Sequence, residues 1–332
     1  MSTTGLPHSS GDTRWHAVAA SRRGARHTAL GMPNQDAYAV AVDGGCTAIA
    51  VADGHGDSAH PRSGEGARIA ADIAVALMAE AGSACGADIE YLRNLLLGDV
   101  GPRMVNQWRA GVLEHQQVYP WTAAETTALG TATPDAGRVF RAYGTTVLAF
   151  VVTPDVFGAF QIGDGDIVVA FRGGMVQRPV PDDLDLIGTK TTSLCQPDPL
   201  QSLRVAALPL TDQPIILAWA STDGFGAQRA DARGWWRRVG SELVSHLQAN
   251  GVGYLDAKLP VWLVEPAELG GDDTTVAMLV DSEFYSGSDR PTVLHEPGSV
   301  SVAAATAAST LSSGQKGPSA FPIPGATPDR VN

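Results

Sequence analysis

The feature that most constrains the fold is the order of the apolar segments along the chain, with strands first, then helices, then strands again. Short apolar runs rich in β-branched residues are typical of strands, and turn pairs such as the one at residues 43–45 join neighbouring runs at hairpin spacing. The expected strands span residues 37–42, 46–53, 145–152, 156–163, 167–172, 175–180, 204–208, 215–222 and 274–280.

Helical periodicity fills the space between the two groups of strands. Ser63 is a candidate N-terminal cap, and Ile69, Ile73 and Leu77 follow at i, i+4 and i+8 as one apolar stripe. The pattern predicts an α+β fold, a β-sandwich of two mainly antiparallel sheets flanked by helices. Further helices are expected at 88–97, 102–117, 231–249 and 252–268, with a break at "GDVGP" and a loop insertion at 119–142.

Composition indicates a single large domain with two flanking segments. The chain has 332 residues, of which 44% are hydrophobic and 17% charged, so it can bury a large core. Residues 14–283 contain no low-complexity break and are predicted to form the domain. Residues 1–13 and the Ser/Ala/Pro/Gly-rich residues 284–332 lack apolar periodicity and are expected to be a disordered lead and a disordered tail.

Charge and hydropathy exclude several classes of function. The chain has 35 acidic and 23 basic residues, and the net charge of −12 disfavours binding to nucleic acid or to anionic lipid. No apolar run is long enough to cross a bilayer, and residues 1–10 lack a signal-peptide pattern. The sequence therefore predicts a cytoplasmic protein that binds neither nucleic acid nor membrane.

Four aspartates stand where an expected strand begins or ends, and they are Asp36, Asp53, Asp223 and Asp272. If these strand ends meet in space, the carboxylates form a negative pocket that needs a cation. Oxygen ligands without cysteine or closely spaced histidine favour Mg²⁺ or Mn²⁺. Gly54 follows Asp53 and leaves the backbone free to approach a metal ion with its carbonyl.

Each aspartate taken alone also fits an ordinary turn, because Asp-Gly is among the commonest turn pairs. Asp43 in "VDGG" is assigned to that class. A calcium-binding loop that begins at Asp53 is excluded, because Ser58 stands where the loop needs glycine and Gly64 where it needs glutamate. The metal-site hypothesis therefore depends on the four aspartates together.

Six motifs in series carry a family resemblance: "NQDAYAV", "VADGHG", "YGTTVLAFV", "IGDGD", "ASTDGFG" and "GGDDTTVAML". Over most of residues 14–283 they resemble the metal-dependent type 2C serine/threonine protein phosphatases, and "GARHTALGMPNQDAYAV" is similar to a bacterial subgroup of that family. The resemblance implies four layers, α-β-β-α, with a centre of two Mn²⁺ or Mg²⁺ ions at one edge. It also implies a phosphorylated protein as substrate and opposition to a bacterial Ser/Thr kinase.

The resemblance assigns the metal ligands residue by residue. Asp53 would bridge the two ions, with the Gly54 carbonyl on one of them. Asp223 and Asp272 would hold the other ion, and Asp36 would act through bound water.

Three neighbouring aspartates have weaker assignments. The resemblance gives Asp164 in "IGDGD" a part in a third, weaker metal site, and a plain hairpin turn is an equal alternative. Asp273 would hold Asp272 in position without binding the metal ion itself. Asp166 stands where the family often has arginine and is left outside the site.

The implied chemistry needs an activated water and an acid. Two divalent ions lower the pKa of a bridging water, and the resulting hydroxide attacks phosphorus in line. His55 is the candidate general acid for the leaving alkoxide, because it lies on a polar glycine turn with no apolar face to fill. A structural role is the alternative for His55, and His60 is expected to be a solvated loop residue.

Phosphate binding is the point where the chain departs from the family. Many members have an arginine five residues before the first aspartate, and here that position is Gly31. Arg26, His27 and Arg62 are candidate replacements, with a solvated surface position as the alternative for each. Residues 181–203 take the place of the family's variable flap beside the active site.

Three functions stay open at this point. The favoured one is a Mg²⁺/Mn²⁺-dependent phosphatase of phosphoserine and phosphothreonine in proteins. The second is a catalytically weak relative that serves as a regulatory or binding module, which the missing arginine favours. The third is a phosphatase of small phosphorylated metabolites, which would use the same core.

Overall fold

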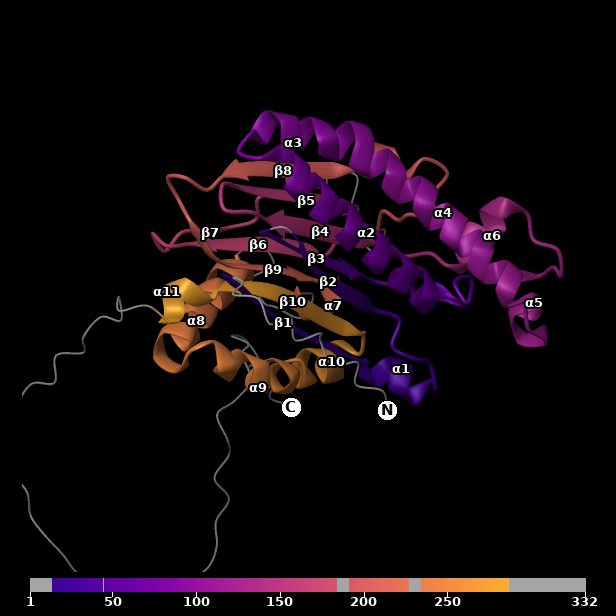
Figure 1. Cartoon of the computed structure of the whole chain (residues 1–332). Coiled ribbons are helices and arrows are strands. Elements are labelled where there is room, and N and C mark those ends of the chain that lie inside the picture. Colours follow the sequence, from indigo (N-terminus) through magenta and orange to yellow (C-terminus); the bar gives the residue numbers. More distant parts are fainter. Residues whose placement is uncertain (1–13, 44, 184–190, 227–233, 287–332) are drawn as a thin grey trace, which may run out of the picture.

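Two five-stranded antiparallel sheets pack face to face in the computed structural model, which describes residues 14–43, 45–183, 191–226 and 234–286 (Figure 1). One sheet has the order β1 (Trp15–Arg22), β10 (Thr274–Asp281), β9 (Ile215–Ser221), β6 (Asp166–Phe171) and β7 (Val176–Gln177). The other has the order β2 (Ala37–Asp43), β3 (Cys46–Ala52), β4 (Val147–Val152), β5 (Val156–Ile162) and β8 (Arg204–Pro209). The predicted lead at 1–13 and nearly all of the predicted tail at 284–332 lie outside the described residues.

Helices cover the outer face of each sheet, so the predicted four layers are confirmed (Figure 1). The sheet that contains β3 is covered by α2 (Ser63–Cys85), α3 (Ile89–Leu95) and α4 (Gly101–Val118), and the other by α8 (Trp235–Asn250) and α9 (Val252–Trp262). The shorter helices are α1 (Ala25–Ala29), α5 (Ala123–Leu129), α6 (Ala136–Ala142), α7 (Asp223–Gly226), α10 (Val264–Gly270), α11 (Ser282–Ser286) and the 3₁₀-helix η2 (Pro199–Ser202).

The central strands are apolar throughout because both of their faces are buried. In β4, Leu148 and Phe150 pack between the sheets, whereas Val147 and Ala149 pack toward α2 and α4. Alternate residues of a strand point to opposite faces, so a strand in the middle of four layers has no solvent face. This arrangement explains why the sequence shows continuous apolar runs rather than a clean alternation.

Three local predictions are corrected. Residues 15–22 form β1, which the strand prediction missed, and β7 is much shorter than expected. The predicted break at "GDVGP" is wrong, because the π-helical turn η1 (Leu96–Val100) joins α3 to α4 and Pro102 falls in the first turn of α4, where a missing N–H is tolerated. The insertion at 119–142 is not a loop but carries α5 and α6.

The C-terminal end of the described part is tied to the sandwich. Asp281 pairs with Arg14 at 2.7 Å, and the Tyr285 side chain in α11 is buried. We expect a chain that ends after Ser286 to keep the melting temperature of the full chain. A chain that ends after Asp281 should lose about 2 kcal/mol from the buried tyrosine, a fall of about 4–8 °C. Thermal melts of both would decide, and equal melting temperatures would contradict the contribution of α11.

Candidate active site

A pocket of about 580 Å³ lies where ends of strands from both sheets meet, and carboxylates line it. Asp53 follows β3, Asp164 lies in the turn between β5 and β6, Asp223 follows β9 and Asp272 precedes β10. These four positions span more than two hundred residues of chain, and the fold brings all four side chains to one pocket. Asp36, just before β2, lies close enough for its negative charge to raise the pKa of Asp53.

The carboxylates of the pocket outnumber the basic side chains among the described residues that line it, where Arg26 is the one arginine and His27 lies 3.6 Å from Asp272. Burial, and then the charges of Asp36, Asp223, Asp272 and Asp164, hold the pKa of Asp53 well above its usual range. Burial, followed by the charges of Asp164 and Asp272, raises the pKa of Asp223 to about 6. Without a counter-ion, this arrangement makes the ionised form of each group less favourable than in water.

Asp36 has one satisfied and one unsatisfied oxygen. Its Oδ2 accepts a hydrogen bond of 2.9 Å from the Thr222 hydroxyl, and its backbone N–H donates to Asn34 Oδ1 at 3.0 Å. Its Oδ1 is buried without a hydrogen-bond partner among the described residues. A buried carboxylate oxygen with no donor is costly, so this atom calls for a cation or a bound water.

The donor set of this pocket fits hard divalent cations. No three His, Cys, Asp or Glu side chains in the described ranges already converge as a ligand set for a metal ion. Carboxylates that face one another without a counter-ion repel. Mg²⁺ and Mn²⁺ bind carboxylate oxygens and water, so the five carboxylates, including the unpaired Oδ1 of Asp36, are suitable ligands for these ions. Of the predicted metal ligands, Asp53, Asp164, Asp223 and Asp272 line the pocket and Asp36 adjoins it.

Gly54 is fixed by close backbone contacts. Its N–H donates to the Gln35 carbonyl at 3.2 Å, and the residue forms an isolated antiparallel bridge with Thr145. A Cβ at this position would lie 2.5 Å from the Gln35 carbonyl oxygen and 2.8 Å from the Ser63 backbone. Only glycine fits between these backbones, so the turn after Asp53 can lie directly on the segment that carries Asp36.

His55 lies at the wall of the pocket as a neutral imidazole. Its Nε2 is 2.8 Å from the Ser193 hydroxyl, and its ring packs edge-on against His60 at 4.8 Å between centroids. Burial, and then the charge of His60, lower the pKa of His55 to about 4. His60 itself is buried and hydrogen-bonded to the Arg141 carbonyl, so the prediction of a solvated loop residue is wrong.

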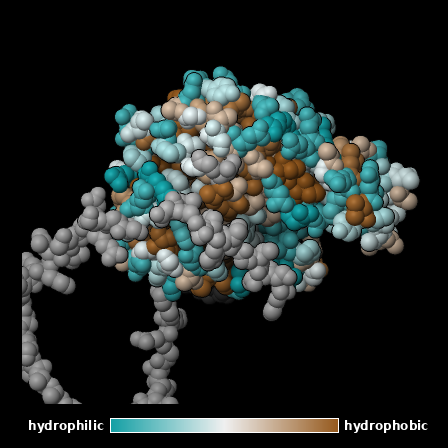
Figure 2. Space-filling model, in the orientation of Figure 1, coloured by the Kyte–Doolittle hydropathy of each residue, from teal (hydrophilic) through white to brown (hydrophobic). Residues whose placement is uncertain are grey.

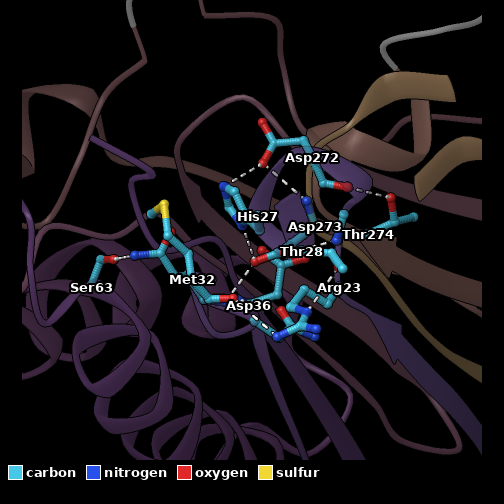
Figure 3. A network of polar contacts seen from close by, with 12 residues as sticks. Arg23, His27, Thr28, Met32, Asp36, Ser63, Asp272, Asp273 and Thr274 are labelled. Atoms are coloured by element: carbon cyan, nitrogen blue, oxygen red, sulfur yellow. Dashed lines mark hydrogen bonds and ion pairs between the residues drawn. The ribbon is translucent and has the colours of Figure 1, made fainter. Parts of the chain in front are cut away.

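Two of the three candidates for phosphate binding are corrected. The His27 side chain is only 2% exposed, with Nδ1 2.8 Å from Asp273 Oδ2 and Nε2 3.6 Å from Asp272 Oδ1 (Figure 3). His27 therefore joins the two aspartates instead of facing a substrate. Arg26 is exposed at the rim of the pocket, and in the part of the chain that is described no carboxylate pairs with it.

Arg62 is also not available to a substrate. Its five N–H groups donate to both carboxylate oxygens of Glu125, to the carbonyls of Tyr119 and Pro120, and to the Tyr143 hydroxyl, at 2.6–3.0 Å. Because no donor is left over, the predicted role of Arg62 in phosphate binding is wrong. The guanidinium instead fastens the 119–142 insertion to the start of α2.

Asp273 organises the wall behind Asp272. It is 2% exposed and accepts hydrogen bonds from the Gly24 N–H at 2.8 Å and the Gln35 N–H at 2.6 Å. Its own N–H donates to Asp272 Oδ1 at 3.0 Å. Asp166, by contrast, pairs with Arg178 at 3.0 Å and does not line the pocket, in line with its place outside the predicted site.

The family model for protein phosphatase 2C matches residues 23–264 of the chain. The match spans most of the domain and includes Asp36, Asp53 and Asp223. The chain belongs to the protein phosphatase 2C family. The predicted family is therefore confirmed, and so is the prediction of an enzyme, a serine/threonine phosphatase.

Solved structures of bacterial phosphatases share the fold of this phosphatase. The S. agalactiae serine/threonine phosphatase is 16% identical, with a TM-score of 0.50 over 80% of this chain and 99% of that one. A bacterial serine phosphatase that carries a point substitution is 13% identical, with a TM-score of 0.51 over 80% and 97%. The Mycobacterium tuberculosis serine/threonine phosphatase PstP/Ppp is 16% identical, with a TM-score of 0.46 over 80% and 98%. A search of curated proteins found no match.

A wide groove adjoins the carboxylate pocket of the phosphatase. It has a volume of about 1510 Å³ and shares Arg26, Gly56, Asp57 and His60 with the pocket. One wall is formed by α1 and the residues after it, and the other by the end of α4 and the start of α5, which stand apart in Figure 1. Three large apolar side chains more than half exposed line these walls: Leu30, Val118 and Tyr119.

Gly31 terminates α1 in this phosphatase. Its φ is +69°, a conformation that favours glycine, and its N–H donates to the Thr28 carbonyl at 3.2 Å. An arginine at this position would be strained. Position 31 therefore serves the end of the helix here and leaves Arg26 as the only arginine among the described residues that line the carboxylate pocket.

Proposed function

We propose that this phosphatase hydrolyses phosphoserine and phosphothreonine in proteins with two bound Mn²⁺ or Mg²⁺ ions. The observation that supports it most directly is the convergence of five carboxylates beside His55. When bound, the ions would activate a water and clamp the phosphoryl oxygens. Asp53, Asp223 and Asp272 would hold them together with the Gly54 carbonyl, Asp36 would act through water, and Asp164 would contribute to a third, weaker site.

The chain's own residues would place the ester and take part in proton transfer. Arg26 at the rim would bind a phosphate oxygen, because its guanidinium is exposed and unpaired among the described residues. His55 at the wall would donate a proton to the leaving alkoxide.

A protein substrate is favoured over a small metabolite by the groove. A cavity of about 1510 Å³ exceeds the range of about 300–1,000 Å³ that is usual for small-ligand pockets. It is continuous with the carboxylate pocket and has apolar side chains on both walls, which suits the chain on either side of a phosphorylated residue. Cytoplasmic location and opposition to a Ser/Thr kinase stay predictions. No helix of the described residues is long and apolar enough to span a bilayer.

Three substrates assayed in parallel test this function. We expect Mn²⁺-dependent turnover of an aryl phosphate and of a phosphothreonine peptide, abolished by chelator, with kcat/KM for the peptide at least about tenfold above that for a sugar phosphate. No turnover with any divalent metal would favour the binding-module alternative. A preference for the sugar phosphate would favour the metabolite alternative.

Arg26→Ala tests the phosphate contact. Loss of one charge-assisted hydrogen bond from the rim should raise KM for the phosphothreonine peptide by roughly tenfold and leave kcat within about threefold. Arg22→Ala, a change of another exposed arginine that does not line the pocket, is the matched control and should leave both constants unchanged. An unaltered KM in Arg26→Ala would exclude the contact.

His55→Ala tests the proton donor. Alkyl esters have poor leaving groups and need protonation, so kcat for the phosphothreonine peptide should fall by about a hundredfold or more. The kcat for p-nitrophenyl phosphate, whose leaving group departs unprotonated, should fall by less than about tenfold. Equal losses on the two substrates would rule out the acid role of His55.

A further inference from the structure

One buried serine in the flap region contacts the candidate acid directly. Ser193 lies 138 positions after His55, its side chain is 3% exposed, and its hydroxyl is 2.8 Å from His55 Nε2. It belongs to the described end of the segment 181–203 that the sequence analysis assigns to the flap. No feature of the local sequence singles out this serine.

The hydrogen bonds around Ser193 fit one assignment of its single proton. The hydroxyl is 2.9 Å from the Thr145 carbonyl and 3.3 Å from Cys195 Sγ, and it accepts the Cys195 N–H at 3.3 Å. Thiol sulfur is only a weak acceptor, so the hydroxyl proton is assigned to the Thr145 carbonyl. One further lone pair remains, which points to a proton on His55 Nε2 as the donor. The Leu194 N–H also donates to the Thr145 carbonyl, at 3.0 Å, so backbone and side chain dock the segment at the same atom.

Residues 144–146, just before β4, also hold the backbone of residues 53–55, where two of the proposed metal ligands lie. The Thr145 hydroxyl and the Thr146 N–H both donate to the Asp53 carbonyl at 2.9 Å, and the His55 N–H donates to the Gly144 carbonyl at 3.1 Å. Residues 53–55 are therefore fixed to 144–146, and 144–146 are fixed to Ser193. This continuous set of hydrogen bonds fixes the backbone of His55 and the Nε2 atom of its ring.

The orientation of the ring follows from its packing. A Cβ on Gly144 would lie 2.8 Å from His55 Cδ2, so the edge with Cδ2 and Nε2 faces this wall. The edge with Nδ1 is turned away from it, on a residue that lines the carboxylate pocket. The Nε2–H tautomer leaves Nδ1 as the nitrogen that can exchange a proton.

We infer that Ser193 is a positioning residue that holds the His55 ring by its Nε2 edge as the Nε2–H tautomer and so leaves Nδ1 as the nitrogen that can exchange a proton. The catalytic part of this inference rests on the proposed function. Ser193 thereby links residues 193–194 and Thr145 to the orientation of the His55 ring. The residue acts through His55 and contacts neither the carboxylates nor the ester.

Nitrogen-15 spectra of the histidine rings test the hydrogen bond without any turnover. In the metal-free protein near pH 7, we expect the His55 proton on Nε2, and a mixture of the two tautomers in Ser193→Ala. Ser193→Thr keeps the hydroxyl and should restore the Nε2–H form. A wild-type proton on Nδ1, or a spectrum that Ser193→Ala leaves unchanged, would overturn the inference.

A double-mutant cycle tests the catalytic part. Ser193→Ala should lower kcat for the phosphothreonine peptide by about tenfold, lower kcat for p-nitrophenyl phosphate by less than about twofold and leave KM unchanged. In the His55→Ala background, the second change should have less than about a twofold effect, because Ser193 acts through that ring. Ser202→Ala, a serine without a side-chain hydrogen bond in the described part, is the matched control.

The two possible failures are distinguishable. A further tenfold loss from Ser193→Ala in the His55→Ala background would show an independent, structural role and would overturn the inference while the phosphatase activity stands. Absence of Mn²⁺-dependent turnover in the wild type would overturn the proposed function and the catalytic part of the inference with it. The tautomer spectrum decides the hydrogen bond in both cases.

Discussion

Replacing Asp53 with asparagine should lower kcat for p-nitrophenyl phosphate by about a thousandfold or more in saturating Mn²⁺. Asp53 lies among four other carboxylates, and the negative charge of each of them raises the pKa of Asp53. Asparagine keeps the size of the side chain but removes one anionic oxygen from the proposed bridge between the two ions. Steady-state rates measured over a wide range of Mn²⁺ concentrations give the loss.

The stability of the metal-free form separates this effect from misfolding. Burial and four neighbouring charges raise the pKa of Asp53, so its ionised form destabilises the folded protein without metal. In chelator, Asp53→Asn should therefore melt at or above the wild-type temperature. Asp212→Asn, the same change at an exposed turn, should alter neither activity nor melting. An active Asp53→Asn enzyme would contradict the proposed bridge.

Replacing Arg62 with alanine should destabilise the domain by about 3 kcal/mol and lower the melting temperature by roughly 6–12 °C. The Arg62 and Glu125 side chains are 8% and 17% exposed, and the change removes five hydrogen bonds and leaves Glu125 without its cation. The guanidinium also stacks on Trp121 at 4.2 Å, so packing is lost as well.

The pH dependence of this loss has a definite sign. The hydrogen bond from Arg62 lowers the pKa of Glu125 from 4.5 to about 2, so the pair stabilises the folded state fully above pH 4.5 and the contribution is lost as the pH falls toward 2. The difference between Arg62→Ala and the wild type should shrink over that range. Arg68→Ala, which breaks exposed pairs, should cost less than about 1 kcal/mol. A large rise in KM for p-nitrophenyl phosphate with unchanged stability would instead favour a phosphate role for Arg62.

The sequence predicts the architecture well because burial on both faces leaves a clear pattern. A short continuous apolar run such as 147–152 is typical of a strand that is buried on both faces. The apolar stripe of α2 indicates a helix that packs with one face on a sheet. The strand β1 escapes prediction because its exposed positions interrupt the apolar run. Its pairing with β10 joins residues more than 250 positions apart, which no local pattern encodes.

The carboxylates could be predicted because each stands at the end of a recognisable strand. The residues that position them could not, because their contacts are distant in sequence. Arg62 meets Glu125 across 63 positions, and Ser193 meets His55 across 138. From the sequence, Arg62 after the glycine turn is a reasonable candidate for binding phosphate. Only the structure shows that all five of its N–H groups already donate to other acceptors in the domain. The sequence singles out His27 as a candidate site residue, but its burial against Asp273 depends on a contact between the first and last parts of the domain, which no local pattern encodes.

The space-filling view shows how the insertion at 119–142 sits on the molecule (Figure 2). Polar residues cover most of the visible face, with apolar patches scattered among them, while the part formed by α5 and α6 stands off the main body. The insertion is therefore an addition to the side of the sandwich, held by Arg62, and its first residues line the groove. We expect its loss to affect peptide substrates more than aryl phosphates.

Direct binding of Mn²⁺ to the metal-free protein tests the central claim, that dispersed carboxylates converge to hold a pair of hard cations. Titration calorimetry of wild type and Asp53→Asn in parallel should show two ions bound per wild-type chain and an affinity at least about a hundredfold weaker in the variant. No binding to the wild type, or the same isotherm for both proteins, would contradict the account.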